Sequence, residues 1–259
     1  MARRPITPKS PAIKKAPALT GFILPAILVS VVLISYWLKI GPPFHTGGVS
    51  SAESAESLLA RGMQAHNAGS LDAAVALYGK ALERDPANAF AHYNLGQVHN
   101  DRGRYAEAQA EYRAALKSKP DFLDARLNLG VAEYRQKQFA AAAETFRAVL
   151  EASPRHPQAL FDLGSTLIEL GRPEQAIPWL AAALREDSRP AATHYYLGLA
   201  YERTAQPAKA RAALERAVAL DPRYGAAYLE LSKVYLAEGE PRLAREAEAK
   251  FAALSAAKK

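Results

Sequence analysis

The sequence is dominated by a unit of 34 residues that recurs without insertion or deletion. Five glycines mark the unit, each 34 residues after the last: Gly62, Gly96, Gly130, Gly164 and Gly198. Sixteen residues after each glycine comes a large apolar side chain, in the order Tyr78, Tyr112, Phe146, Leu180 and Leu214. An alanine lies twelve residues after each glycine, at Ala74, Ala108, Ala142, Ala176 and Ala210. Because five consecutive units keep one period, we expect each to form the same local structure and to stack on its neighbours.

Each unit is predicted to be a pair of helices. Its alanine, its large apolar residue and a further apolar residue follow at spacings of four and three, which places them on one face of a helix. Proline ends this second helix in four units, because it lacks a backbone donor; these prolines are Pro86, Pro120, Pro154 and Pro222. A left-handed glycine can close the first helix, and glycine stands there at Gly69, Gly103, Gly171 and Gly239. Lys137 and Ala205 take that place in the other two units.

At these residues the chain resembles the tetratricopeptide repeat (TPR) family, whose repeat is a helix-turn-helix of 34 residues. Two segments reproduce the first-helix core of that family: His-Tyr-Asn-Leu-Gly at 92–96 and His-Tyr-Tyr-Leu-Gly at 194–198. The resemblance extends from about Ala55 to the end of the chain. It implies an all-α fold, a right-handed α-solenoid of five TPR units at 55–88, 89–122, 123–156, 157–190 and 191–224, followed by a degenerate sixth unit at 225–258.

The sixth unit is expected to cap the stack. An array of repeats leaves an apolar face uncovered at each end, so terminal repeats need a polar outer surface. Glu248 stands where earlier units have an aromatic residue or leucine, and Phe251 stands where they have a smaller residue. We therefore predict a capping helix at 241–255, with random drift at a tolerant terminus as the alternative.

The first 54 residues differ in composition from the repeats. The segment 18–38, from Ala18 to Leu38, has 21 residues without a charge. As a helix it would span about 31 Å, which matches a bilayer core. More positive charges precede this segment than follow it, which favours a cytoplasmic amino terminus. We predict a basic cytoplasmic tail at 1–17, a transmembrane helix at 18–38, a flexible linker at 39–54 and an extracytoplasmic repeat domain, periplasmic in a Gram-negative bacterium.

A cleaved signal peptide is the main alternative to a membrane anchor. The apolar region of a signal peptide has 7–15 residues and ends at small residues. Here the apolar segment is longer, and it ends in Tyr36, Trp37 and Leu38. The second alternative is the opposite orientation, with the repeats in the cytosol, which would resemble the organelle import receptors of the family.

Charge and motif content argue against several classes of function. The formal net charge is +7, but six of the 33 basic residues lie in the first 39 positions, so the remainder carries 27 basic against 26 acidic residues. The repeats therefore lack the basic stripe that nucleic acids require. No P-loop, G-x-S-x-G or H-E-x-x-H motif occurs, cysteine is absent, and only His92 and His99 share a helix face. We predict no catalytic residue, metal, cofactor, small-molecule substrate or nucleic acid.

In the TPR family the first helix of each unit lines the concave side, which directs the search for binding residues. Asn94 and Asn128 resemble the asparagine ladder with which some members hold an extended peptide, and Asp162 and Tyr196 interrupt it. A side-chain amide suits this role because it offers a donor and an acceptor to a peptide backbone. The family's cationic clamp for a carboxyl-terminal carboxylate lacks its cations here. The predicted partner-binding residues are Asn94, Asn128, Asp162, Phe90, Tyr93, Gln97, Phe161, Tyr195 and Tyr196.

The aromatic members of this set have a second interpretation, which is packing between helices. No segment remains for a catalytic domain once the tail, the transmembrane helix, the linker and the repeats are assigned. The sequence therefore predicts a membrane-anchored scaffold or adaptor that binds protein or peptide segments and assists assembly or stability of a membrane or envelope complex. A fixed structural subunit of a larger membrane complex, and a targeting module for a separate enzyme or translocon, are the alternatives.

Overall fold

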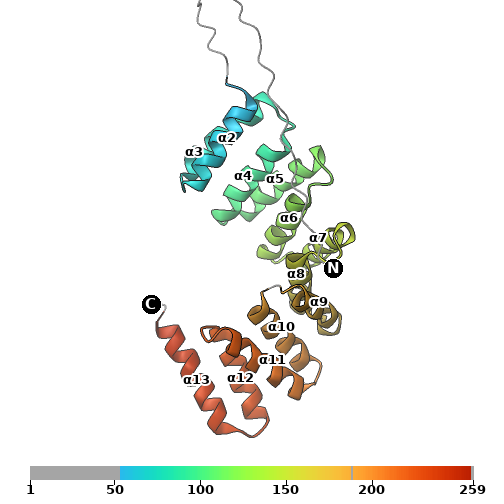
Figure 1. Cartoon of the computed structure of the whole chain (residues 1–259), viewed down its shortest axis with the longest axis vertical. Coiled ribbons are helices and arrows are strands. Elements are labelled where there is room, and N and C mark those ends of the chain that lie inside the picture. Colours follow the sequence, from blue (N-terminus) through green and yellow to red (C-terminus); the bar gives the residue numbers. More distant parts are fainter. Residues whose placement is uncertain (1–52, 188, 258–259) are drawn as a thin grey trace, which may run out of the picture. The chain divides into compact units, whose positions relative to one another are not determined.

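The computed structural model describes residues 53–187 and 189–257 of the chain. The twelve helices of this part are labelled in Figure 1. Their bounds are α2 (Ala55–Asn67), α3 (Leu71–Arg84), α4 (Ala89–Asp101), α5 (Tyr105–Ser118), α6 (Leu123–Arg135), α7 (Phe139–Ala152), α8 (Pro157–Glu169), α9 (Pro173–Arg185), α10 (Pro190–Arg203), α11 (Pro207–Leu220), α12 (Gly225–Ala237) and α13 (Pro241–Ala256). The predicted all-α fold is confirmed. The predicted tail, the predicted transmembrane helix and all but the last two positions of the linker lie outside the described residues.

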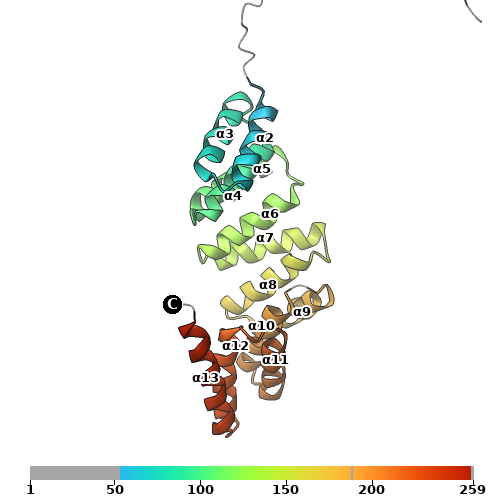
Figure 2. The same cartoon turned by 60° about the vertical axis from the view of Figure 1, so that its left-hand side comes forward.

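Consecutive helices form pairs, and the pairs follow one another in chain order (Figures 1 and 2). Each helix contacts the helix before it and the helix after it. The first helices of neighbouring pairs also contact each other from α2 to α10, whereas within the described residues the second helices of neighbouring pairs do not come as close. The first helices therefore lie together on one face, which we call the inner face. The second helices form the outer face.

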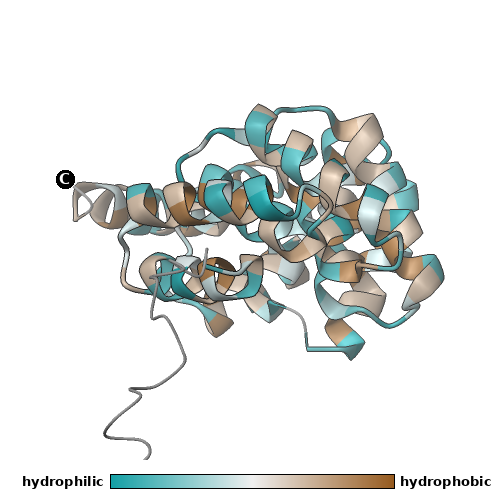
Figure 3. Cartoon of the chain, turned by 90° about the horizontal axis from the view of Figure 1, so that it is seen from above, coloured by the Kyte–Doolittle hydropathy of each residue, from teal (hydrophilic) through white to brown (hydrophobic). Residues whose placement is uncertain are grey.

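The helices carry apolar and polar residues on different sides. Figure 3 shows hydrophobic and hydrophilic residues alternating along the ribbons, as expected for helices that bury one side against their neighbours. The longest helix that the structure describes, α13, has 16 residues. In residues 53–187 and 189–257, no helix combines the length and the apolar character needed to cross a bilayer.

A close contact between a glycine and a large side chain holds five of the six pairs together. A methyl group at Gly130 of α6 would lie 2.6 Å from Cε1 of Phe146 on α7, and one at Gly62 would lie 2.4 Å from Cε1 of Tyr78. The same contact recurs in three further pairs, between Gly96 and Tyr112, Gly164 and Leu180, and Gly198 and Leu214. All five large side chains are fully buried. The repeated glycine is therefore required because any side chain there would keep the two helices apart.

The turns inside the pairs place one residue in the left-handed region, as the sequence predicts. Four of these residues are the glycines at 69, 103, 171 and 239, with φ between 69° and 76°. Lys137 and Ala205 adopt the same conformation, with φ of 59° and 55°. The amide of the residue after Gly69 donates to the carbonyl of Ala65 at 2.9 Å, which closes α2. The backbones of Lys137 and Ala205 are therefore strained, because the turn between the two helices requires a left-handed residue there.

The last pair, α12 and α13, lacks the glycine contact. Ser232 replaces the glycine and is buried, while Glu248 replaces the large apolar residue and is exposed. Phe251 packs beside Gly225 at the start of α12 instead, where a methyl group would lie 3.6 Å from its Cδ2. The pair is therefore built differently from the five before it, as expected for a degenerate unit. Its role as a cap stays a prediction.

Substitution of Gly130 by alanine should destabilise the protein. The added methyl group would meet the ring of buried Phe146 at 2.6 Å, and overpacking of this kind costs roughly 1–3 kcal/mol. We expect the midpoint of urea unfolding to fall, measured by circular dichroism at 222 nm on the full chain.

Gly79→Ala is the matched control. Gly79 lies inside α3, and a methyl group there would meet no atom within 4 Å. Alanine in an open helical position should raise stability by about 0.5–1 kcal/mol. Equal midpoint shifts for the two variants would show that the close contact does not hold the pair together.

Candidate functional site

A pocket of about 350 Å³ opens on the inner face between α6, α8 and α10, and we call it the inner pocket. Three of its lining residues belong to the predicted partner-binding set: Phe161, Asp162 and Tyr196. The other lining residues are Val131, Tyr134, Arg135, Phe146, Gln158, Ser165, Arg189, Ala192 and Tyr224. The lining thus combines aromatic rings with two guanidinium groups and one carboxyl group.

Asp162 is the polar centre of the inner pocket. Its side chain is only 12% exposed, its Oδ1 lies 3.9 Å from Nη1 of Arg189, and its Oδ2 is buried without a hydrogen-bond partner. Burial raises the pKa of the Asp162 carboxyl to about 6, because it penalises the charged form more than Arg189, Gln158 and Arg135 favour it. A buried oxygen without a partner is costly. The carboxyl group can therefore either hold a proton or accept a hydrogen bond from a ligand.

Aromatic rings form the walls around this carboxyl group. The rings of Phe161 and Tyr196 meet edge to face with 5.6 Å between centroids, and Tyr195 lies 5.3 Å from Tyr196 and 5.2 Å from Tyr224. The guanidinium of Arg189 lies over the Phe161 ring at 5.2 Å. Burial raises the pKa of Tyr195 to about 12, so its hydroxyl stays neutral near pH 7. The walls are apolar surfaces with neutral hydroxyl groups.

A second group of rings lies nearer the start of the inner face, and we call it the aromatic cluster: Phe90, Tyr93 and Phe122. Phe122 lies 5.2 Å from Phe90 and 4.8 Å from Tyr93, measured between centroids. The ammonium group of Lys119 lies over both phenylalanine rings, at 5.1 and 5.3 Å. Phe90 is 48% exposed, which is unusual for a phenylalanine side chain. The cluster therefore offers an apolar contact to a partner.

Tyr93 connects several predicted residues by hydrogen bonds. Its hydroxyl accepts from Nε2 of Gln97 at 3.0 Å and from Nδ2 of Asn128, one unit further along, at 3.3 Å. Nδ2 of Asn94 donates to the carbonyl of Phe90 at 2.7 Å, within α4. One N–H of each asparagine amide is therefore engaged inside the protein. The second N–H and the carbonyl oxygen of each amide are the groups left for a peptide.

The predicted residues thus fall into two places on one face. Phe161, Asp162 and Tyr196 line the inner pocket, with Tyr195 beside them. The other five lie nearer the start of the inner face: Tyr93, its two donors Gln97 and Asn128, and the hydrogen-bonded pair Phe90 and Asn94. Phe161 is buried in the core of the stack, so its role is partly the packing that we gave as the alternative. The binding role of all nine residues stays a prediction.

Sequence reasoning missed two charged residues of the inner pocket. Arg135 lies seven residues after Asn128 on α6, a spacing that puts both on one helix face and could have directed attention to it. Arg189 gave no such signal, because it belongs to the turn before α10 and reaches the pocket only through a left-handed backbone with φ of 46°.

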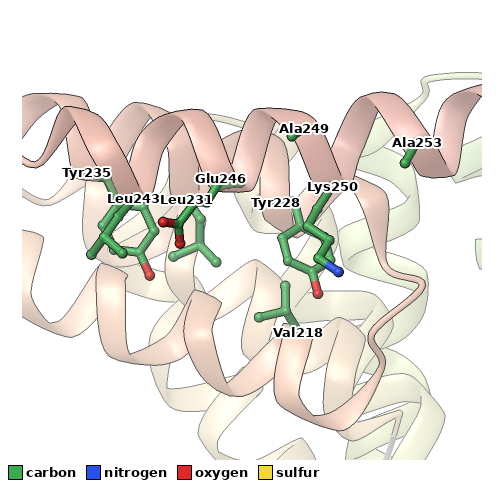
Figure 4. Close-up of a pocket in the computed structure, with 10 residues that line it drawn as sticks. Val218, Tyr228, Leu231, Tyr235, Leu243, Glu246, Ala249, Lys250 and Ala253 are labelled. Carbon is green, nitrogen blue, oxygen red and sulfur yellow. The ribbon is translucent and has the colours of Figure 1, made fainter.

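A larger hollow of about 600 Å³, the outer groove, lies between α11, α12 and α13 (Figure 4). In the figure the rings of Tyr228 and Tyr235 and the side chain of Val218 lie beneath the ribbon of α13. Ala247, one of its lining residues, stands at the repeat position that Trp179 holds two units earlier. Its lining is mostly apolar, with charges at Glu246 and Lys250. The inner pocket, although smaller, is the better candidate site because a buried carboxyl oxygen without a partner and two guanidinium groups converge there.

Of the two histidines that the sequence singled out, His92 is held by polar contacts, whereas Nδ1 of His99 is buried without a hydrogen-bond partner. Nδ1 of His92 lies 2.6 Å from Oε2 of Glu111, and its Nε2 lies 3.1 Å from the carbonyl oxygen of Pro86. No group of three or more histidine, cysteine, aspartate or glutamate side chains in the described part of the chain could hold a metal ion. His92 thus links α4 to α5 and to the turn before α4.

Asp162→Asn should change how stability depends on pH. Because folding raises the pKa of this carboxyl from 3.8 to about 6, the folded state binds the proton more tightly, and wild-type stability falls as pH rises through this range. Asparagine cannot titrate, so the free energy of unfolding of the variant minus that of the wild type should grow by roughly 2–3 kcal/mol between pH 4 and pH 7. Urea unfolding at the two pH values measures the difference.

Ser165→Ala is the control for this experiment, since it changes the same pocket without removing a titratable group. Its effect on stability should be the same at both pH values. A pH-independent difference for Asp162→Asn would contradict the assigned environment of the carboxyl group.

Comparisons with known proteins bear on the family and the fold of the chain. The family profile described as tetratricopeptide repeat matches residues 59–120, 101–157 and 135–193, and a second profile of the same description matches 191–224. No curated protein matches the sequence. None of these family matches is to a catalytic domain.

Solved structures match the repeats as well. The crystal structure of YrrB, described as a TPR protein with an unusual peptide-binding site, is 26% identical, covers 68% of this chain and 90% of its own, and has a TM-score of 0.62. MamA from Desulfovibrio magneticus RS-1, from residue 41 onward, is 24% identical over 66% of this chain and 97% of its own, with a TM-score of 0.61. A TPR protein from Parabacteroides merdae is 18% identical over 74% of this chain and 77% of its own, with a TM-score of 0.66.

The last two likenesses concern the fold alone, because their identities are low. The family profiles, in contrast, match the sequence itself across five of the six helix pairs and more than half of the chain. The chain belongs to the tetratricopeptide repeat family.

Proposed function

We propose that this chain is a membrane-anchored scaffold whose inner face binds extended segments of partner proteins, and that it assists the assembly or stability of a membrane or envelope complex. Membership of the TPR family supports a role in protein–protein interaction. The observation that carries the proposal is the inner face from α4 to α10, which holds both the exposed ring of Phe90 and the buried Asp162 Oδ2 without a hydrogen-bond partner.

The inner face suits an extended segment because it offers two kinds of contact in one line of helices. The aromatic cluster on α4 and the turn before α6 supplies apolar contact through Phe90. The inner pocket between α6, α8 and α10 supplies a carboxyl acceptor and guanidinium donors. An extended peptide presents side chains and unpaired backbone groups in alternation, so it can use both. YrrB is described as having a peptide-binding site, and we extend that type of binding to this chain.

Anchoring through Ala18–Leu38 would make such binding effective at the membrane. The segment is uncharged over 21 residues, and a linker at 39–54 would leave the repeats free to move near the bilayer. Confinement raises the effective concentration of a membrane-bound partner without any added contact. We place the repeats on the extracytoplasmic side, because positive charges precede the segment.

The test is quantitative co-purification from native membranes. The tagged full chain is extracted in mild detergent after cross-linking, and bound proteins are measured by mass spectrometry for the wild type, Phe90→Ala and Leu220→Ala. Both substitutions remove a large exposed apolar side chain, one on the inner face and one on α11 of the outer face. Loss of Phe90 should weaken partner binding by roughly five- to thirtyfold, about 1–2 kcal/mol, whereas Leu220→Ala should leave it unchanged.

Three outcomes would contradict the proposal. Equal recovery of partners by the three proteins would remove the inner face as the binding surface. Recovery of the chain only as a free monomer would contradict a role in a complex. Release of the chain from membranes by alkaline carbonate would contradict the anchor.

A further inference from the structure

Two guanidinium groups of the inner pocket have donors that the protein does not use. Arg189 is 55% exposed and comes no closer than 3.9 Å to the Asp162 carboxylate. Arg135 is exposed and takes part in none of the ion pairs found among residues 53–187 and 189–257. Arg211, on the outer face, shows the contrast, since it lies 2.8–2.9 Å from the carboxylates of three glutamates. The two pocket guanidinium groups are therefore available to a ligand.

The carboxyl group between them can adapt to either charge state. The titratable side chains that face Asp162 are Arg135 and Tyr134 from α6, Arg189 from the turn before α10, Tyr196 from α10, and Tyr224 from the turn before α12. Its pKa of about 6 lies close to neutral pH, so a modest change in its surroundings decides whether it carries a proton. With Asp162 ionised, the lining carries a net charge of +1, and with Asp162 protonated it carries +2.

We propose that the inner pocket is a subsite for an acidic side chain, aspartate or glutamate, of the bound partner segment, with its carboxylate held between Arg135 and Arg189. This inference rests on the proposed binding of extended segments to the inner face. Arginine suits the role, because its planar guanidinium donates in a fork that matches a carboxylate. The Arg189 guanidinium also stacks over the Phe161 ring, 5.2 Å from its centroid, and this contact helps to hold the guanidinium in place.

The ligand carboxylate also explains what becomes of Asp162. When Arg189 turns to the ligand, Asp162 loses the stronger of the two arginine charges that favour its ionised form. Its carboxyl group then takes up a proton from solvent. The protonated carboxyl group can then donate a hydrogen bond to the incoming carboxylate. Binding of an acidic segment should therefore be accompanied by uptake of one proton and should be tighter at pH 5.5 than at pH 7.5.

A lysine or arginine side chain is the opposite possibility, with Asp162 as its acceptor. Such a ligand would bring a third positive charge into a lining that already has two and offers one carboxylate. The observed charges therefore favour an anion. A positively charged ligand should respond to the same substitutions in the opposite direction from a negatively charged one, so one experiment distinguishes the two kinds of ligand.

The experiment selects ligands from a displayed library of random dodecapeptides on the detergent-solubilised full chain at pH 5.5. We expect aspartate or glutamate to be enriched at one position among the selected peptides. A selected peptide with glutamate there, and the same peptide with glutamine, are then synthesised. Their affinities for the wild type, Arg135→Gln, Asp162→Asn and Arg216→Gln are measured by fluorescence anisotropy at pH 5.5 and 7.5.

Arg135→Gln should weaken binding of the glutamate peptide at least tenfold and leave the glutamine peptide unchanged. Asp162→Asn should tighten the glutamate peptide at pH 7.5 and abolish the pH dependence. Arg216→Gln is the control, since it removes an exposed arginine of α11 on the outer face and should have no effect. Arg135 is exposed, so the loss of its side chain should not prevent folding, and circular dichroism checks each variant.

Each of the other possible results would contradict a specific part of the proposal. Enrichment of basic residues, with binding lost in Asp162→Asn, would assign the subsite to a cation. Acidic enrichment that is indifferent to Arg135→Gln would place the acidic side chain elsewhere. Selected peptides without any acidic preference would overturn the subsite and leave the proposed function standing. Failure to select any peptide would count against both.

Discussion

The contact between a glycine of one helix and the large side chain of the next is the constraint on which the structure depends. It occurs in five consecutive pairs, and in each the glycine leaves just enough space for a buried Tyr, Phe or Leu. Close approach within a pair fixes how its two helices cross, and repetition of one pair geometry brings successive first helices into contact. The inner face therefore follows from the packing of each pair.

The proposed binding uses side chains that the packing of the helix pairs does not require. The first helices meet along the inner face, and side chains that are not needed to close a pair remain there as exposed or unsatisfied groups. Phe90 and Asp162 are two of them. Arg189 joins them because the turn before α10 holds two residues, Asp187 and Arg189, in the left-handed conformation. The site is thus assembled from an ordinary repeat surface and one irregular turn.

The helix pairs and their order could be predicted from the sequence, because glycine, alanine and proline each act locally and recur at fixed spacing. Individual residues of the inner face could be found in the same way, and Asp162 and Tyr196 do lie together in the inner pocket. The hydrogen bond from Asn128 to the Tyr93 hydroxyl could not be found, since it joins residues 35 positions apart through the stacking of two units. The outer groove could not be predicted either, because its lining is assembled from side chains of three helices, α11, α12 and α13.

The central claim is that partner segments bind along the inner face. Amide hydrogen exchange of the full chain, measured by mass spectrometry with and without a selected peptide, tests it most directly, because exchange reports protection of each helix separately. The account predicts slower exchange in α4, α6, α8 and α10, and unchanged exchange in α11 and α13. Protection confined to α11, α12 and α13 would place the ligand in the outer groove and would contradict the claim.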